Sequence, residues 1–77
     1  MRSIEKRAED LRDTYYFILY ELQSNPIPKE LMIQAKKCAI IDVQNTLRAL
    51  DMVEGEYTSL YEEEQFYLEI LKHIKKL

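Results

Sequence analysis

Six consecutive apolar or aromatic residues, Tyr15 to Tyr20, constrain the fold of this chain more than any other feature. They lie in a segment whose apolar residues alternate at spacings of four and three, as along one seam of an α-helix. The residues of that seam are Ile4, Ala8, Leu11, Tyr15, Ile18 and Leu22. Six consecutive residues surround a helix completely, so this half of the helix needs cover on more than one side. We therefore expect it to pack against several elements or against another copy of the chain.

The clearest boundary in the sequence is Asn25-Pro26-Ile27-Pro28. Each proline disfavours the α conformation at the residue before it, and Pro28 suits the first position of a helix. The pattern predicts one helix over about 3–23, with Ser3 as its N-cap, and a second helix over about 28–53.

A third helix is predicted over about 57–76, where apolar residues again follow a three-and-four spacing. Gly55 is expected to end the second helix. The third helix begins either with a capping box formed by Ser59 and Glu62 or directly at Glu56.

The expected fold is a single all-α domain over residues 1–77, an antiparallel helical hairpin plus a third helix, assembled into a homo-oligomer. A chain of 77 residues buries only roughly 60–65% of its unfolded surface. The single Cys38 can form no internal disulfide, so oligomerisation is the support that we expect. The side chains predicted at the interface are Tyr15, Phe17, Leu19, Leu31, Cys38, Ile41, Phe66 and Ile70.

The charge pattern argues against several function classes. A net charge of -3 disfavours nucleic-acid binding, which needs a basic face. There is no apolar run of about 20 residues and no signal peptide, so we expect no membrane span and a cytoplasmic location, in the host cytoplasm if the protein is viral. Glutamates at 54, 56 and 62–64 form an acidic stretch suited to attracting a basic partner surface.

The polar residues give little support for catalysis, and we expect neither enzymatic activity nor a cofactor or metal. His73 is the only histidine, and its relation to Glu69 one turn earlier does not supply a metal set. Three consecutive glutamates at 62–64 point about 100° apart, which favours a solvated face. Asp42 and Asn45 interrupt the second helix either as an exposed strip or as polar walls of a site between helices.

The six tyrosines have two interpretations. Most are expected to be core or interface residues whose hydroxyls reach the surface. Alternatively, Tyr16 and Tyr20 stack on a flat ligand such as a nucleobase, with Lys29 and Lys36 near its phosphates.

A set of residues around the proline turn resembles the helical hairpin of phage anti-CBASS and anti-Thoeris sponge proteins. These residues are Glu21-Leu22, Lys29, Leu31, Ala39-Ile40 and Asn45 to Arg48. The resemblance covers about half of the chain, and the third helix is an addition to it. It implies that a cyclic nucleotide binds between subunits without being cleaved, with Tyr16, Lys29 and Arg48 as the nearest equivalents of the contact residues.

Two functions follow from these patterns. The first is a small non-enzymatic, self-assembling protein that acts as a protein-interaction adaptor or inhibitor. The alternative is a sponge that sequesters a cyclic nucleotide, with Tyr16, Tyr20, Lys29, Lys36 and Arg48 as its ligand-binding residues.

Overall fold

The computed structural model describes residues 3–53 and 60–77, and this part of the chain contains three α-helices and no strand. α1 spans Ile4–Leu22, α2 spans Pro28–Val53 and α3 spans Tyr61–Lys76. The all-helical prediction is confirmed for these residues. The predictions for Gly55, Glu56 and Ser59, and for a start of the third helix near 57, lie outside the described residues.

The ends of the first two helices follow from local chemistry. Ser3 is extended, and its hydroxyl accepts a hydrogen bond from the Lys6 amide at 3.1 Å, which confirms the predicted N-cap. α1 ends at Leu22, and Pro28 opens α2 without needing an amide hydrogen. At α3, Leu60 precedes the first helical residue without a side-chain cap, and Glu62 to Glu64 in the first turn complement the helix dipole.

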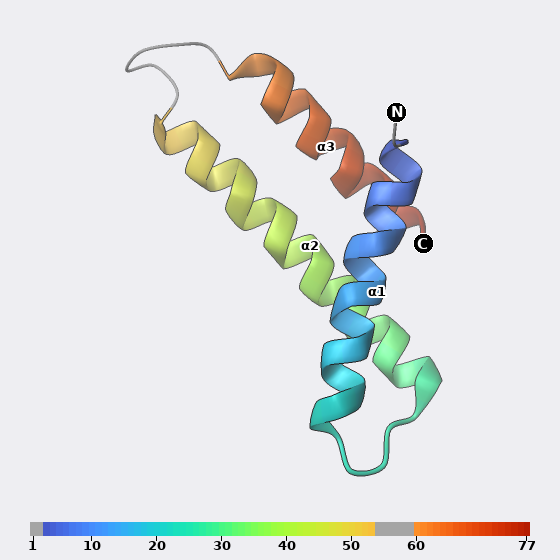
Figure 1. The fold of residues 1–77 in the computed structure, drawn as a ribbon. Coiled ribbons are helices and arrows are strands. Elements are labelled where there is room, and N and C mark those ends of the chain that lie inside the picture. Colours follow the sequence, from blue (N-terminus) through green and yellow to red (C-terminus); the bar gives the residue numbers. More distant parts are fainter. Residues whose placement is uncertain (1–2, 54–59) are drawn as a thin grey trace.

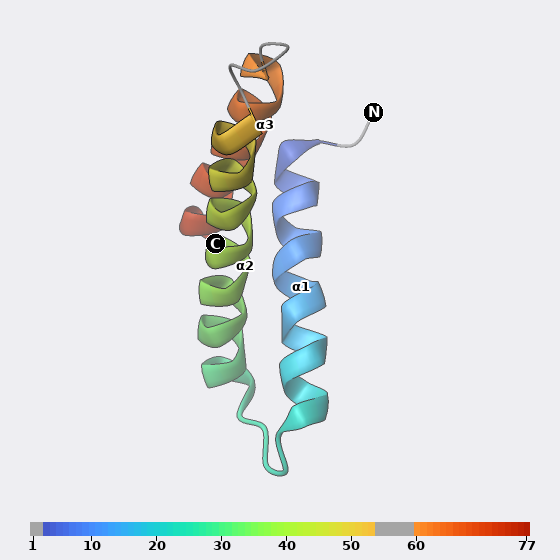
Figure 2. The ribbon, with the colours of Figure 1, turned by 90° about the vertical axis from the view of Figure 1, so that its left-hand side faces the viewer.

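The helices form two layers (Figures 1 and 2). α2 and α3 lie side by side and antiparallel, and α1 lies across them as a separate layer. The N-terminal end of α1 lies over the C-terminal half of α3, whereas its C-terminal end lies beside the N-terminal half of α2. Because α1 crosses the pair, its two halves have different neighbours.

One compact core joins all three helices. It consists of Ala8, Ala39, Val43, Ile70 and Ile74, none of which is more than 2% exposed. The two alanines are fully buried, so their small side chains allow neighbouring helices to pack closely around them.

The half of the hairpin near Asn25 receives no cover from α3. α3 has 16 residues against 26 in α2, so it is shorter by about 15 Å along the axis. Leu31 and Ala35 are still fully buried there. Seven large apolar side chains, which we call the apolar end, are between 39% and 76% exposed: Phe17, Ile18, Tyr20, Leu22, Ile27, Met32 and Ile33.

Among the described helices, none is long and apolar enough to cross a membrane.

Candidate functional site

Two adjoining cavities lie where α1 and α2 diverge. The first has a volume of about 310 Å³ and is lined by all three helices, and the second has a volume of about 500 Å³ and is lined by α1 and α2. Asp42 and Thr46 line both cavities, so the two adjoin at these residues, and we call the two cavities together the junction groove. Its polar residues are Arg7, Asp10, Thr14, Asp42, Asn45 and Thr46. Val43, Tyr67 and Ile70 give its three-helix part an apolar floor.

A hydrogen bond between α1 and α2 fixes the centre of this groove. The Tyr15 hydroxyl donates to Asp42 Oδ2 at 2.6 Å. The bond to the Asp42 carboxylate, partial burial and the charge of that carboxylate raise the pKa of Tyr15 to about 12. Tyr15 therefore stays protonated at neutral pH and holds the Asp42 side chain in one orientation.

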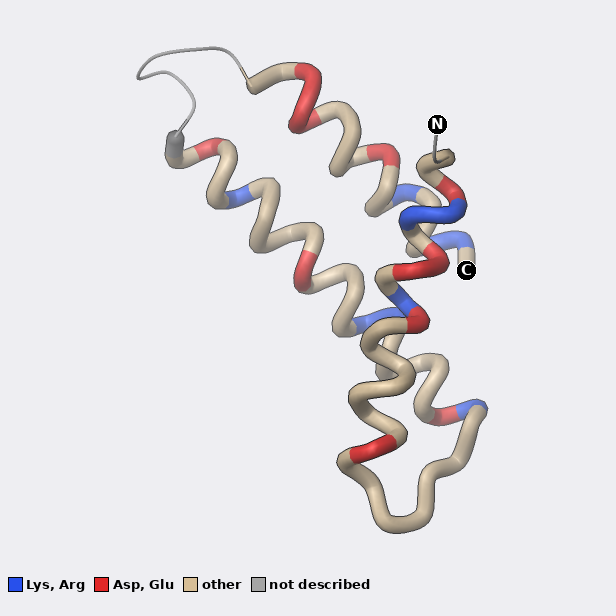
Figure 3. Tube along the Cα trace, viewed as in Figure 1, with Lys and Arg blue, Asp and Glu red and all other residues tan. Residues whose placement is uncertain are grey.

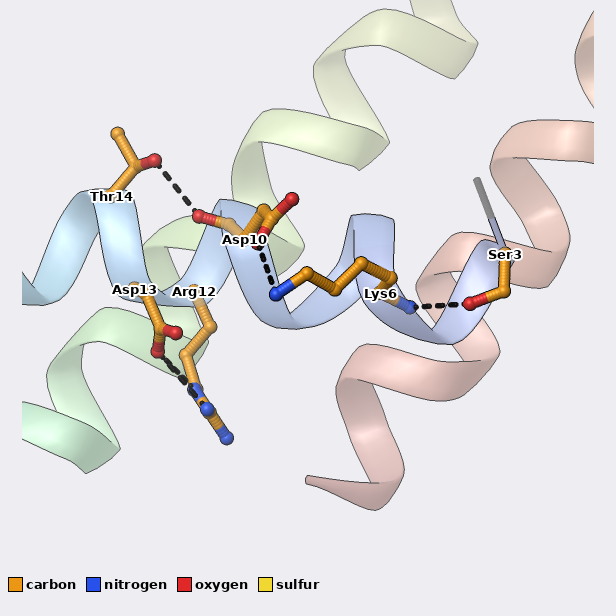
Figure 4. Close-up of polar contacts among 6 residues, drawn as sticks. All are labelled: Ser3, Lys6, Asp10, Arg12, Asp13 and Thr14. Atoms are coloured by element: carbon orange, nitrogen blue, oxygen red, sulfur yellow. Dashed lines mark hydrogen bonds and ion pairs between the residues drawn. The ribbon is translucent and has the colours of Figure 1, made fainter. Parts of the chain in front are cut away.

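Both groove threonines direct their hydroxyl protons back into their own helices. Thr14 donates to the Asp10 carbonyl at 2.8 Å, as Figure 4 shows, and Thr46 donates to the Asp42 carbonyl at 3.1 Å. A hydroxyl has a single proton to donate, so each threonine oxygen offers only acceptor lone pairs to a molecule in the groove.

The charged residues around the groove differ in how they are neutralised. Lys6 Nζ lies 3.4 Å from Asp10 Oδ1, and Arg12 lies 3.0 Å from Asp13 Oδ1, both on α1 (Figure 4). Asp42 is half-buried, and no cation pairs with it among residues 3–53 and 60–77. Within the described residues, the Asp42 carboxylate at the centre of the groove thus has a hydrogen bond from Tyr15 and no ion pair.

Asp42 and Asn45 had two interpretations in the sequence. Both line the cavity between α1 and α2, and Asp42 also lines the cavity at the three-helix junction. Asp42 is half-buried and Asn45 is exposed to solvent, so a role for the two as polar walls of a site between helices stays a prediction.

The residues predicted to bind a nucleotide are spread along the hairpin. Tyr16 and Tyr20 stack on each other, with ring centroids 6.4 Å apart and planes 24° apart. Lys29 and Arg48, however, are 19 positions apart on α2, or about 28 Å along its axis. A single chain does not bring these two cations together, so a site formed by several copies of the chain stays a prediction, as does a role for Lys36, which is half-buried on the same helix.

The predicted interface residues fall into three groups. Phe17, Ile41 and Phe66 are exposed, and Tyr15, Leu19 and Cys38 are half-buried. Leu31 and Ile70 lie inside the subunit and present almost no surface to a partner.

The remaining polar candidates have local partners. Glu69 lies 3.7 Å from the Lys72 ammonium group, and Glu64 is half-buried at the start of α3. In the part of the chain that the structure describes, no three His, Cys, Asp or Glu side chains are grouped so that they could hold a metal ion.

Sequence reasoning missed the α1 side of the junction groove. Arg7, Asp10 and Thr14 follow a spacing of three and four, so they share one flank of the helix. That spacing was a usable signal for a polar flank, but it does not reveal that the flank faces Thr46 and Tyr67 on two other helices.

Comparisons with protein-family models, curated proteins and solved structures find no match to this chain.

Proposed function

We propose that this chain is a non-enzymatic cytoplasmic protein that self-assembles through its apolar end and acts by binding a protein partner, as an adaptor or inhibitor. The exposure of the apolar end supports the self-assembly. At roughly 100 Å² for each half-exposed side chain, its seven residues present roughly 700 Å². This sum covers side chains on more than one side of α1 and α2, and a standard interface takes about 800 Å² from each partner.

The charge distribution favours a second copy of the chain as the occupant of the apolar end. Between Thr14 and Ala35 the only charged residues are Glu21, Lys29 and Glu30. Figure 3 accordingly shows this end of the hairpin almost free of Asp, Glu, Lys and Arg, in contrast to the N-terminal half of α1. Two copies related by a two-fold axis bring identical patches together, so a nearly uncharged patch avoids like-charge repulsion.

The chemistry of the junction groove supports binding rather than catalysis. Tyr15 and Asp42 are hydrogen-bonded like an acid–base pair, but the raised pKa of Tyr15 moves it away from neutrality. An efficient general acid or base needs a pKa near the working pH.

Static light scattering at micromolar concentration tests self-assembly. We expect the parent to exceed 9.3 kDa and Phe17→Asp to shift it toward the monomer with unchanged helical circular dichroism. Phe17 is 65% exposed within the subunit, so the new charge disturbs an interface and not the core. Gln44→Asp, at an exposed position on α2, is the matched control. A monomeric parent, or a Phe17→Asp variant that keeps the parent's mass, would refute assembly through the apolar end.

The stacked pair of Tyr16 and Tyr20 favours a second candidate, the cyclic-nucleotide sponge. Tyr20 is 50% exposed, so one aromatic face of the pair is accessible to a base. In that case the cations Lys29, Lys36 and Arg48 come from different subunits around the ligand. Recovery of an intact nucleotide from the heat-denatured protein would support the sponge over the protein-partner function.

A further inference from the structure

We propose that the junction groove binds an arginine side chain of the protein partner, with the guanidinium group at Asp42 and the flanking apolar residues against Leu11, Tyr67 and Ile41. This inference rests on the proposed function, because it names the chemistry of the partner that the chain binds.

The first observation is the hydrogen-bonding character of the groove centre. Thr14 and Thr46 have both given their protons to backbone carbonyls, and Tyr15 has given its proton to Asp42. The carboxylates of Asp10 and Asp42 are acceptors as well. The centre therefore presents acceptors, and it is complementary to a group that has several donors and no acceptor. The donors in the lining are the exposed guanidinium of Arg7 and the Tyr67 hydroxyl in the first cavity, and the Asn45 amide and the Cys38 thiol in the second.

The second observation is charge. Asp42 is half-buried and, within the described residues, lacks a cationic partner. Asp10 is paired with Lys6 at 3.4 Å and Arg7 adds a positive charge to the first cavity, whereas no cation among the described residues is paired with Asp42. A cation is attracted most strongly to Asp42, because partial burial weakens the screening of its charge by solvent.

The third observation is the aromatic ring on the floor. Tyr67 lines the three-helix cavity, and Phe66 packs edge-on against it with ring centroids 5.3 Å apart. A guanidinium group is planar and weakly hydrated, with five donors, and it stacks on aromatic faces more readily than an ammonium group does. This favours arginine over lysine.

The shape of the groove favours a polypeptide over a free small molecule. The two cavities adjoin along α2 and are open to solvent, whereas small-molecule sites bury 70–90% or more of their ligand. The accessible apolar groups beside the polar centre, the half-buried Leu11 and Tyr67 in the first cavity and the exposed Ile41 in the second, suit the residues that flank an arginine.

The test is a titration of the full-length ¹⁵N-labelled protein, followed by NMR, with the capped tripeptide acetyl-Leu-Arg-Leu-amide. We expect shifts of the Thr14, Thr46 and Ile70 amide signals at millimolar peptide. The matched peptide carries citrulline, which has nearly the same shape as arginine but no charge, and we expect at least about tenfold weaker binding. Methylguanidinium alone serves as the small-molecule arm and is expected to bind more weakly than the arginine peptide.

Two protein variants complete the test. Asp42→Asn keeps an acceptor for the Tyr15 hydroxyl but removes the charge, and it is expected to weaken arginine-peptide binding about tenfold or more. Asp51→Asn, at an exposed position on α2, removes the same charge elsewhere and should leave binding unchanged. Equal binding of the citrulline peptide, equal binding by Asp42→Asn, equal affinity for methylguanidinium, or no shift at these groove signals would each overturn the proposal. Light scattering reports self-assembly independently, so failure of this groove and failure of the apolar end are distinguishable.

Discussion

Replacing Tyr15 by phenylalanine should destabilise the fold by an amount that depends on pH in a defined way. The substitution removes the 2.6 Å hydrogen bond to Asp42 and keeps the ring that packs against the core. A rise of the Tyr15 pKa from 10.0 to about 12 corresponds to about 2.7 kcal/mol at most. Solvent screens this half-buried site, so we expect a loss of about 1 kcal/mol. For a domain of this size the melting temperature should fall by about 4–8 °C.

The direction of the pH dependence follows from proton binding. Between pH 10 and about 12 the unfolded state has released the Tyr15 proton and the native state still holds it. Stability therefore falls with rising pH in this window. The stabilisation by Tyr15 is complete below pH 10 and is lost as the pH approaches 12. The free-energy difference between the parent and Tyr15→Phe should be constant from neutral pH to about pH 9 and should shrink above pH 10.

Urea unfolding of both proteins at a series of pH values measures this difference, and the absorbance of phenolate reports the titration directly. Tyr20→Phe is the control, because the Tyr20 hydroxyl has no hydrogen bond to the described residues. An absent stability difference at pH 7, or a difference that stays flat from pH 10 to 12, would show that the bond to Asp42 does not stabilise the fold as argued.

Three further predictions concern the core, the first helix and the alternative function. Ile74→Ala, at a fully buried position, should lower the free energy of unfolding in urea by about 2–5 kcal/mol. Ile33→Val at the apolar end should change it by less than about 0.5 kcal/mol, and equal losses for the two variants would contradict the assigned core. Ser3→Ala removes the acceptor for the Lys6 amide and should lower the stability by about 1 kcal/mol, whereas Ser3→Asp supplies another acceptor and should keep the stability of the parent. Helical circular dichroism and the melting temperature measure both variants. An unchanged stability of Ser3→Ala would mean that the cap contributes nothing. If the protein is a sponge, a cyclic di- or trinucleotide or a cyclic ADP-ribose isomer at a hundredfold excess over Kd should add about 2.7 kcal/mol to the free energy of unfolding. The melting temperature should then rise by about 10 °C or more, and Tyr16→Ala should abolish this rise. No shift with any of these nucleotides excludes the sponge.

The sequence by itself determined the helical elements and the place of the surplus apolar surface. Ser3 and the two prolines act through local chemistry, so the start of α1 and the turn before α2 could be predicted without knowledge of the neighbours. The six-residue apolar run likewise predicted that one end of the hairpin lacks sufficient cover, and three of the side chains left exposed there, Phe17, Ile18 and Tyr20, belong to that run.

The tertiary structure decided which of these residues are buried and what the polar residues face. Leu31 and Ile33 are both apolar residues in the first turns of α2, yet Leu31 is fully buried and Ile33 is 51% exposed. The difference depends on the path of α1 and on where α3 ends, and neither is encoded in local periodicity. The bond between Tyr15 and Asp42 joins residues 27 positions apart, and the junction groove exists because α1 diverges from α2 as it crosses to α3. Spacing along a helix tells which residues share a flank, but only the packing of the helices tells what that flank meets.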